Sequence, residues 1–188
     1  MDAGVPPGRT RSRLYLLLIL AIFLAPLVTA LVLYYRDWQP TRTKSNGELL
    51  HPVRDLRAVA FTRDDGRAFV WNHEDHIWRL LVALPANCGA NCDRLEDTLR
   101  RVWVGLGNNA DHVQVLWIGA APAARFRNLI VARADAKLAT RLPDTATPTA
   151  IPVYLVDPSG YLFMRYAPGF DPGGMRRDLQ RLTSQGGM

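Results

Sequence analysis

An uncharged stretch near the N-terminus constrains the fold of this chain more than any other feature. It runs from Leu14 to Tyr35 and reads LYLLLILAIFLAPLVTALVLYY, 22 residues in all. A helix rises about 1.5 Å per residue, so this stretch reaches about 30 Å, the thickness of the hydrocarbon core of a bilayer. Pro26 lies inside it, and proline is tolerated in membrane helices. We therefore predict one transmembrane helix over residues 14–35.

A cleaved signal peptide is the alternative interpretation of the same stretch. Signal peptides have apolar regions of about 7–15 residues followed by small residues at the cleavage site. Here the apolar run is longer, and it ends in Tyr34 and Tyr35 with Trp38 just beyond. Aromatic residues in that position are typical of a membrane interface. The sequence therefore favours an uncleaved anchor.

Basic residues on the two sides of the anchor predict its orientation. Three arginines precede it, at positions 9, 11 and 13, with no acidic residue among them. The basic residues that follow, within residues 36–44, are more dispersed and are accompanied by Asp37 and Glu48. Because basic residues gather on the cytoplasmic side, we place residues 1–13 in the cytoplasm and the rest of the chain beyond the membrane. A cysteine pair persists as a disulfide in such an oxidising compartment.

The net charge of +6 does not indicate a nucleic-acid partner. It divides equally, with +3 up to residue 50 and +3 after it. In the second part, acidic and basic residues are interspersed rather than gathered in blocks. We therefore expect no nucleic-acid binding.

We predict a linker over residues 36–50, because Pro40, Asn46 and Gly47 disfavour regular structure there. Residues 51–188 are then predicted to form one outer domain. Apolar periodicity and turn residues predict a hairpin, a strand, a helix, a strand, a helix, two strands joined by a turn, and a final helix. The segments are 56–62 with 67–71, 77–84, 93–106, 112–118, 122–130, 152–156 with 161–166, and 172–182. Strands that alternate with helices form a parallel central pair with right-handed crossovers. We predict an α/β fold with a thioredoxin-like central sheet and flanking helices.

Two cysteines at the predicted junction of strand and helix are the main candidates for chemistry. Cys88 and Cys92 are four residues apart, which in a helix brings their Cα atoms to about 6 Å, within the range of a disulfide. Cys92 falls on the same helix face as Leu95 and Leu99, so we expect it to be partly buried and Cys88 to be more exposed. Because a helix N-terminus favours the thiolate, we assign Cys88 as the attacking thiol and Cys92 as the resolving thiol.

Other roles for the same residues stay open at this point. The reduced pair suits a soft cation such as Cu(I), but a passive structural bridge or two unused thiols also fit the sequence. The four histidines, at positions 51, 73, 76 and 112, are more simply explained as surface residues than as ligands. Pro152 begins a predicted strand, where thioredoxin folds commonly have a cis-proline beside the active cysteines. We therefore include Pro152 in the site and expect a cis Ile151–Pro152 bond, a trans proline being the alternative.

With the strand, the CxxxC motif, the helix and the YLVDPSG turn of residues 154–160 in place, the chain resembles the Sco/SenC family. Members of that family are membrane-anchored copper chaperones with a thioredoxin fold that assist the assembly of cytochrome c oxidase. The likeness covers most of residues 14–183, including the hairpin at Asp65-Gly66-Arg67. It implies an anchor in the bacterial inner membrane, a domain in the periplasm, and a protein client such as an oxidase subunit or another assembly factor. It also implies a thiol–disulfide or copper-handling role for Cys88 and Cys92.

The chain departs from the family pattern at two places. The family has proline after its second cysteine, whereas Asp93 stands here, and residues 147–152 lack the family's copper-binding histidine. Only Cys88 and Cys92 carry over as metal ligands, which favours disulfide exchange or Cu(I) over Cu(II), since Cu(II) normally needs nitrogen as well. The main alternative is a non-catalytic binding module with a structural disulfide in the same assembly context. A peroxidase-like enzyme is a weaker interpretation, because residues 87–91 supply no charged group beside Cys88.

Overall fold

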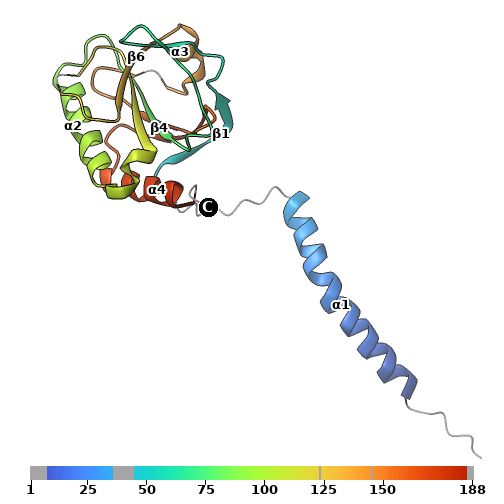
Figure 1. Cartoon of the computed structure of the whole chain (residues 1–188). Coiled ribbons are helices and arrows are strands. Elements are labelled where there is room, and N and C mark those ends of the chain that lie inside the picture. The colour runs from blue at the N-terminus through green and yellow to red at the C-terminus, as the bar shows by residue number, and fades with distance from the viewer. Residues whose placement is uncertain (1–7, 36–44, 123, 145, 186–188) are drawn as a thin grey trace, which may run out of the picture. The chain divides into compact units, whose positions relative to one another are not determined.

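The computed structural model of the chain describes residues 8–35, 45–122, 124–144 and 146–185 (Figure 1). The chain divides into two compact units, Met1–Lys44 and Ser45–Met188. The first seven residues of the predicted cytoplasmic tail lie outside the described residues. So do residues 36–44 of the predicted linker, including Trp38.

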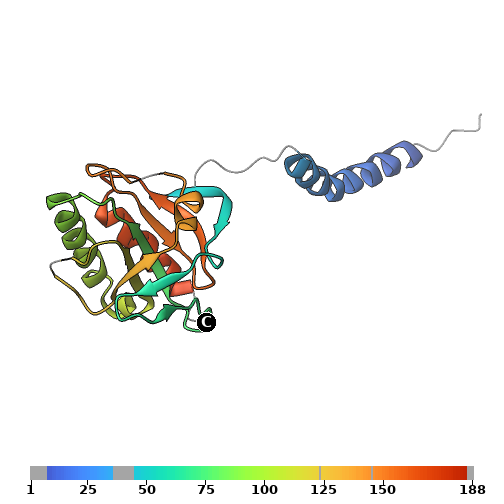
Figure 2. The ribbon, with the colours of Figure 1, turned by 90° about the horizontal axis from the view of Figure 1, so that it is seen from above.

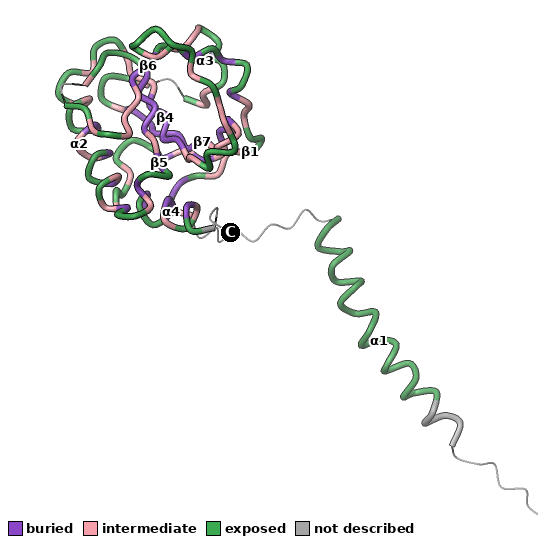
Figure 3. The backbone as a smooth tube through the Cα atoms, viewed as in Figure 1, coloured by how far each residue is buried: buried purple, intermediate pink, exposed green. Residues whose placement is uncertain are grey.

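The first unit contains one long helix, α1, over Gly8–Tyr35. Its segment Arg13–Tyr35 is long enough and apolar enough to cross a membrane. Every side chain described in this helix is exposed, as the green tube in Figure 3 shows. Exposed apolar surface of this extent is unfavourable in water, and a bilayer removes that penalty. The predicted N-terminal apolar helix is therefore confirmed as a candidate membrane span.

Among the described residues, eight strands of the second unit form one mixed sheet in the order β1-β8-β7-β4-β5-β6-β2-β3. Strands β4, β5 and β6 are parallel to one another, and the other neighbouring pairs are antiparallel. The strands are β1 Glu48–Asp55, β2 Phe61–Arg63, β3 Ala68–Phe69, β4 Trp78–Ala83, β5 Val113–Ile118, β6 Leu129–Ala134, β7 Val153–Val156 and β8 Tyr161–Tyr166. The helices of this unit are α2 Ala90–Val104, η1 Gly107–His112, α3 Lys137–Arg141 and α4 Pro172–Gln185.

The sheet is covered on both faces, so its central strands are almost continuously apolar. Successive side chains of a strand point to opposite faces. On one face, Leu80 and Val82 of β4 pack in a cluster with Leu99 of α2 and Leu179 of α4. On the other face, Leu81 packs in a second cluster with the residues before and within the β2–β3 hairpin and with α3. Figure 2 shows the strands and helices of the ribbon from above, and Figure 3 shows that the buried residues concentrate in the central strands.

Local signals in the sequence explain where α2 ends and where α4 begins. Helix α2 buries Leu99 and Val102 on one face and ends at Gly105. Before α4, the carboxylate of Asp171 accepts hydrogen bonds from the backbone N–H groups of Gly173 at 2.9 Å and Gly174 at 2.8 Å. These bonds satisfy donors that have no partner within the helix. The predicted start of α4 at Pro172 and the predicted buried faces of both helices are therefore confirmed, whereas α2 begins at Ala90, three residues before the predicted start.

Two sequence predictions about this unit are wrong. The predicted helix over 122–130 is absent from the described residues of that segment, and β6 begins at Leu129 instead. Val131 and Ala132 of β6 pair in parallel with β5 and are buried on opposite faces of the sheet, which a surface helix does not allow. The predicted linker also ends too late, since β1 begins at Glu48 and pairs with β8.

Candidate functional site

The site is centred on a disulfide at the start of α2. Cys88 and Cys92 are bonded to each other, with their Cα atoms 5.5 Å apart, as the spacing predicts. The backbone N–H of Cys92 donates to the carbonyl of Gly89 at 3.0 Å, so the chain turns tightly between the two sulfurs. Gly89 has a φ of 44°, a conformation that glycine adopts without steric penalty.

Solvent reaches the disulfide through a cavity of about 560 Å³. Both cysteines are half-buried and pack against the core cluster on the α2 side of the sheet. Cys92 is partly buried, as expected, and Cys88 is also of intermediate exposure. The sulfurs are thus neither sealed in the core nor fully in solvent, as disulfide exchange requires.

The cavity lies at the carboxyl ends of the parallel strands β4 and β5, where open α/β sheets commonly bind ligands. One wall is the segment after β4, which carries Leu84 and Pro85, and the other is the segment after β5, which ends in Pro122. The backbone N–H of Leu84 donates to the carbonyl of Ile118 at 2.9 Å, and this bond joins the two walls where they leave the sheet. The fully buried Trp117 also lines the cavity, and its indole N–H donates to the carbonyl of Ala120 at 2.8 Å.

A buried carboxyl group follows Cys92 by one helical turn. Glu96 is 6% exposed, and burial raises its pKa above the usual value. Nε of Arg100 lies 3.9 Å from Oε1 of Glu96, and within the described residues this oxygen accepts no hydrogen bond. Sequence reasoning missed Glu96, although its spacing of four from Cys92 places both on one side of the helix.

Pro152, the third predicted site residue, is buried and directly precedes β7. The expectation of a cis Ile151–Pro152 bond is wrong, since the cis bond among the described residues precedes Pro52 instead. The Ile151–Pro152 bond is trans, and it follows a turn in which Thr147 and Ala150 form two mutual backbone hydrogen bonds of 3.1 Å. Pro152 is not among the residues that line the disulfide cavity.

The donor set around the cysteines does not form a multidentate metal site. Within the described residues, no group of three or more His, Cys, Asp or Glu side chains is placed to hold a metal ion. The side-chain amide of Asn91 donates to the carbonyl of Pro148 at 2.9 Å, which ties the start of α2 to the loop that lacks a histidine. When reduced, the two sulfurs suit two-coordinate Cu(I), whereas Cu(II) lacks the nitrogen ligand that it prefers.

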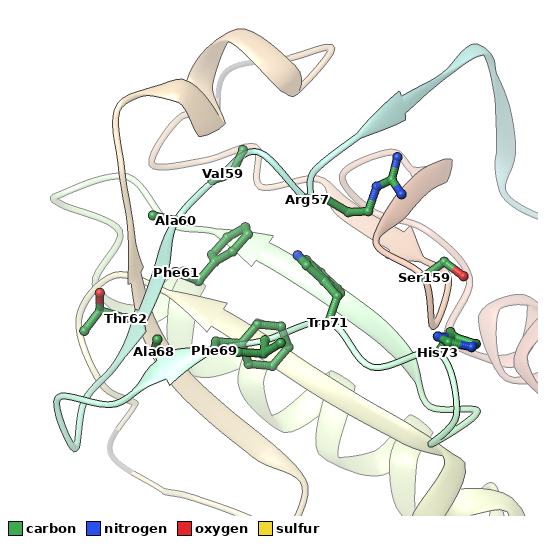
Figure 4. Close-up of a pocket in the computed structure, with 11 residues that line it drawn as sticks. Arg57, Val59, Ala60, Phe61, Thr62, Ala68, Phe69, Trp71, His73 and Ser159 are labelled. Atoms are coloured by element: carbon green, nitrogen blue, oxygen red, sulfur yellow. The ribbon is translucent and has the colours of Figure 1, made fainter.

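A second cavity, of about 640 Å³, has no cysteine in its lining (Figure 4). Phe61, Phe69 and Trp71 form its aromatic wall, with ring centroids 5.1–6.1 Å apart. The guanidinium of Arg79, a residue only 3% exposed, lies 5.2 Å and 5.3 Å from the centroids of Phe69 and Trp71. His73 lines this aromatic cavity, and it is not a lining residue of the disulfide cavity. The aromatic wall and the buried cation stabilise the β2–β3 side of the sheet.

The central sheet, the disulfide at the start of α2 and the preceding apolar helix define a thioredoxin-fold protein with a candidate membrane anchor. The family described as "Transmembrane-like, thioredoxin-like, C-terminal domain" matches residues 78–184, more than half of the chain. The chain therefore belongs to this family. No curated protein matches it.

Several solved structures have a similar fold. BsSco, a member of the Sco family of cytochrome c oxidase assembly proteins, is 12% identical, with 71% of this chain and 95% of that chain covered and a TM-score of 0.52. A putative electron transfer protein from Aquifex aeolicus is 14% identical, with 70% and 96% covered and a TM-score of 0.52. Copper-bound ScoI from Arabidopsis thaliana is 14% identical, with 75% and 99% covered and a TM-score of 0.50. The predicted thioredoxin-like fold and the resemblance to Sco proteins are thus confirmed at the level of the fold.

Proposed function

We propose that this protein is a membrane-tethered thiol–disulfide exchange factor that acts on a protein client through Cys88 and Cys92. The observation that carries the proposal is a half-buried disulfide at the start of α2, reached from solvent through its own cavity. A structural bridge needs no such access. The helix N-terminus favours the thiolate, and a thiolate is both the attacking and the leaving form in exchange.

The exchange takes place in two steps that transfer two electrons. In the oxidising direction, a client thiolate attacks Sγ of Cys88, the bond to Cys92 breaks, and Cys92 leaves as a thiolate. A second client thiolate then attacks the client sulfur of the mixed disulfide and releases Cys88. The client ends as a disulfide, the Cys88–Cys92 pair ends as two thiols, and the two thiol protons of the client pass to the pair through solvent. The reducing direction is the reverse, and the two reduction potentials decide between them.

The client in this proposal is a subunit or assembly factor of a respiratory oxidase in the bacterial inner membrane. The arginines at positions 9, 11 and 13 favour a cytoplasmic N-terminus and a periplasmic domain. A tether confines the domain to the membrane surface and so raises its effective concentration near a membrane-embedded client. The fold shared with BsSco, an oxidase assembly protein, supports this context. The reduced pair also holds Cu(I) as cargo, which agrees with the copper-bound form of the similar ScoI.

Single serine variants of the two cysteines test the proposed order of attack. Cys92→Ser keeps the attacking thiol and removes the resolving one, so we expect it to accumulate a mixed disulfide with the client in membranes. Cys88→Ser removes the attacking thiol, so it forms none, and oxidase maturation falls. Covalent complexes are separated on non-reducing gels and identified by mass spectrometry. Equal trapping by both variants, or by neither, contradicts the assignment.

The second candidate function is a binding module in which the disulfide is only structural. It is supported by the packing of both cysteines against the core cluster. The reduction potential of the pair separates the two functions. A value of about −300 mV or lower indicates a structural bridge, and a higher value indicates exchange.

A further inference from the structure

An apolar cavity of about 280 Å³ lies next to the disulfide cavity. The two cavities share Leu84 and Pro85 as lining residues, so these two residues form the ridge between them. The apolar cavity is bounded by the carboxyl ends of β4, β5 and β6, by α3, and by Leu142, Asp144 and Ala146. We call it the ridge pocket.

The ridge pocket is suited to an aliphatic group. Its largest apolar side chains are those of Leu84, Ile118, Leu138 and Leu142, and alanines provide much of the rest. Its two carboxylates already have partners: Asp135 accepts from the backbone N–H of Lys137 at 3.0 Å, and Asp144 pairs with Arg165. A binding pocket with apolar walls and few polar groups selects mainly by shape and burial.

We infer that the ridge pocket receives an aliphatic side chain from the client segment that carries the reacting cysteine. This inference rests on the proposed exchange function and names the sequence feature that it selects. The disulfide cavity is walled by the ridge on one side and by the segment ending in Pro122 on the other. A client chain whose sulfur reaches Cys88 can leave across either wall, and the ridge is the wall that has an apolar pocket on its far side.

Crossing the ridge brings the residues beside the client cysteine over the ridge pocket. An extended chain advances about 3.3 Å per residue, so a neighbour of the cysteine reaches the pocket within a few residues. The small volume suits one or two side chains rather than a helix or a second copy of this domain. The carboxylates of Asp135 and Asp144 at the pocket also disfavour anionic lipid as its occupant.

The test uses the full chain in lipid nanodiscs, with its cysteines reduced. The substrates are disulfide-linked dimers of short peptides that contain one cysteine, with a single leucine placed at successive positions within about five residues of it. Matched peptides carry serine in place of leucine, and oxidised glutathione is the substrate with no side chain for the pocket. In each reaction the peptide disulfide is reduced to two thiols while Cys88 and Cys92 become a disulfide, and tryptophan fluorescence gives the rate.

We expect a leucine at the matching position to raise the second-order rate about tenfold over serine, as partial burial of one aliphatic side chain implies. Ala139→Leu fills the ridge pocket from α3 and removes this advantage, while the rate with oxidised glutathione stays unchanged. Ala136→Leu is the matched control, because Ala136 is exposed, directly precedes α3 and is not a lining residue. This control keeps the advantage.

Three results overturn the inference while the proposed function stands: no leucine advantage at any position, an advantage that survives Ala139→Leu, or equal loss in Ala136→Leu. A change in oligomeric state caused by Ala139→Leu instead identifies a second copy as the occupant and also overturns it. If the reduced pair fails to react with oxidised glutathione and the Cys88–Cys92 disulfide also fails to react with reduced glutathione, the exchange function itself is wrong, and the inference falls with it.

Discussion

The disulfide between Cys88 and Cys92 closes a short loop, so we predict that the domain stays folded when it is reduced. The two cysteines are separated by four positions in the sequence. In the chain-entropy model, a closed loop of about five residues stabilises a protein by about 2 kcal/mol. A domain of ordinary stability, about 5–15 kcal/mol, remains folded after that loss. A redox-active pair needs this property, because its reduced form must keep the shape of the site.

A substitution in the apolar core gives a stability loss with which the loss of the disulfide can be compared. Leu99 of α2 is fully buried between the helix and the sheet. Truncation of such a leucine to alanine costs about 3–5 kcal/mol, because a cavity is added to the lost burial. We therefore expect Leu99→Ala to destabilise the domain more than loss of the disulfide does.

Urea denaturation of the full chain, followed by tryptophan fluorescence, measures both changes. The samples are the oxidised protein, the reduced protein, the double variant Cys88→Ala/Cys92→Ala, and Leu99→Ala as control. The reduced protein and the double variant should each lose about 2 kcal/mol with an unchanged denaturant slope. If either loses more than Leu99→Ala, or unfolds without urea, the disulfide is a structural element and the binding-module function is favoured.

Two further variants test buried carboxyl groups. Burial raises the pKa of Glu96, so the native state binds the carboxyl proton more tightly than the unfolded state does. The free energy of unfolding therefore falls as the pH rises from the ordinary carboxyl range through the raised pKa of Glu96. Glu96→Gln should therefore exceed the wild type in stability at about pH 8 and equal it at about pH 4, and a difference independent of pH contradicts this. Asp178 accepts hydrogen bonds from Asn46, Gly47 and Tyr166. In Asp178→Asn, an amide N–H group faces one of these donors, so we expect the free energy of unfolding to fall by about 2 kcal/mol and proteolysis near residue 46 to be faster. Unchanged stability and unchanged proteolysis contradict this role of Asp178.

The sequence predicts best those elements whose signals are local. The spacing of apolar residues and Gly105 define α2, and Asp171 defines the start of α4. The turn at residues 157–160 is equally local, with the N–H of Gly160 donating to the carbonyl of Asp157 at 3.1 Å. The approach of Cys88 to Cys92 follows from the same short-range geometry. Each of these features depends on fewer than about twenty neighbouring residues.

The elements that sequence reasoning missed depend on distant partners. Strand β6 exists because it pairs with β5 on one side and β2 on the other, while Phe126, Leu129 and Ile130 alone fit a helix face equally well. Strand β1 is stabilised by pairing with β8, more than 100 residues later. The ridge pocket is formed by segments from Ala83 to Ala146 that have no common motif. Register and cavities of this kind arise only when the sheet is assembled.

Under the proposed function, exchange and copper holding exclude each other at any one moment. Cu(I) binding needs both thiolates, whereas the disulfide has neither, so oxidation of the pair by two electrons removes the metal ligands. The loop at residues 147–150 contains no histidine that could serve as a further ligand, and the side-chain amide of Asn91 ties this loop to α2. The redox state of Cys88 and Cys92 therefore decides which activity the domain has.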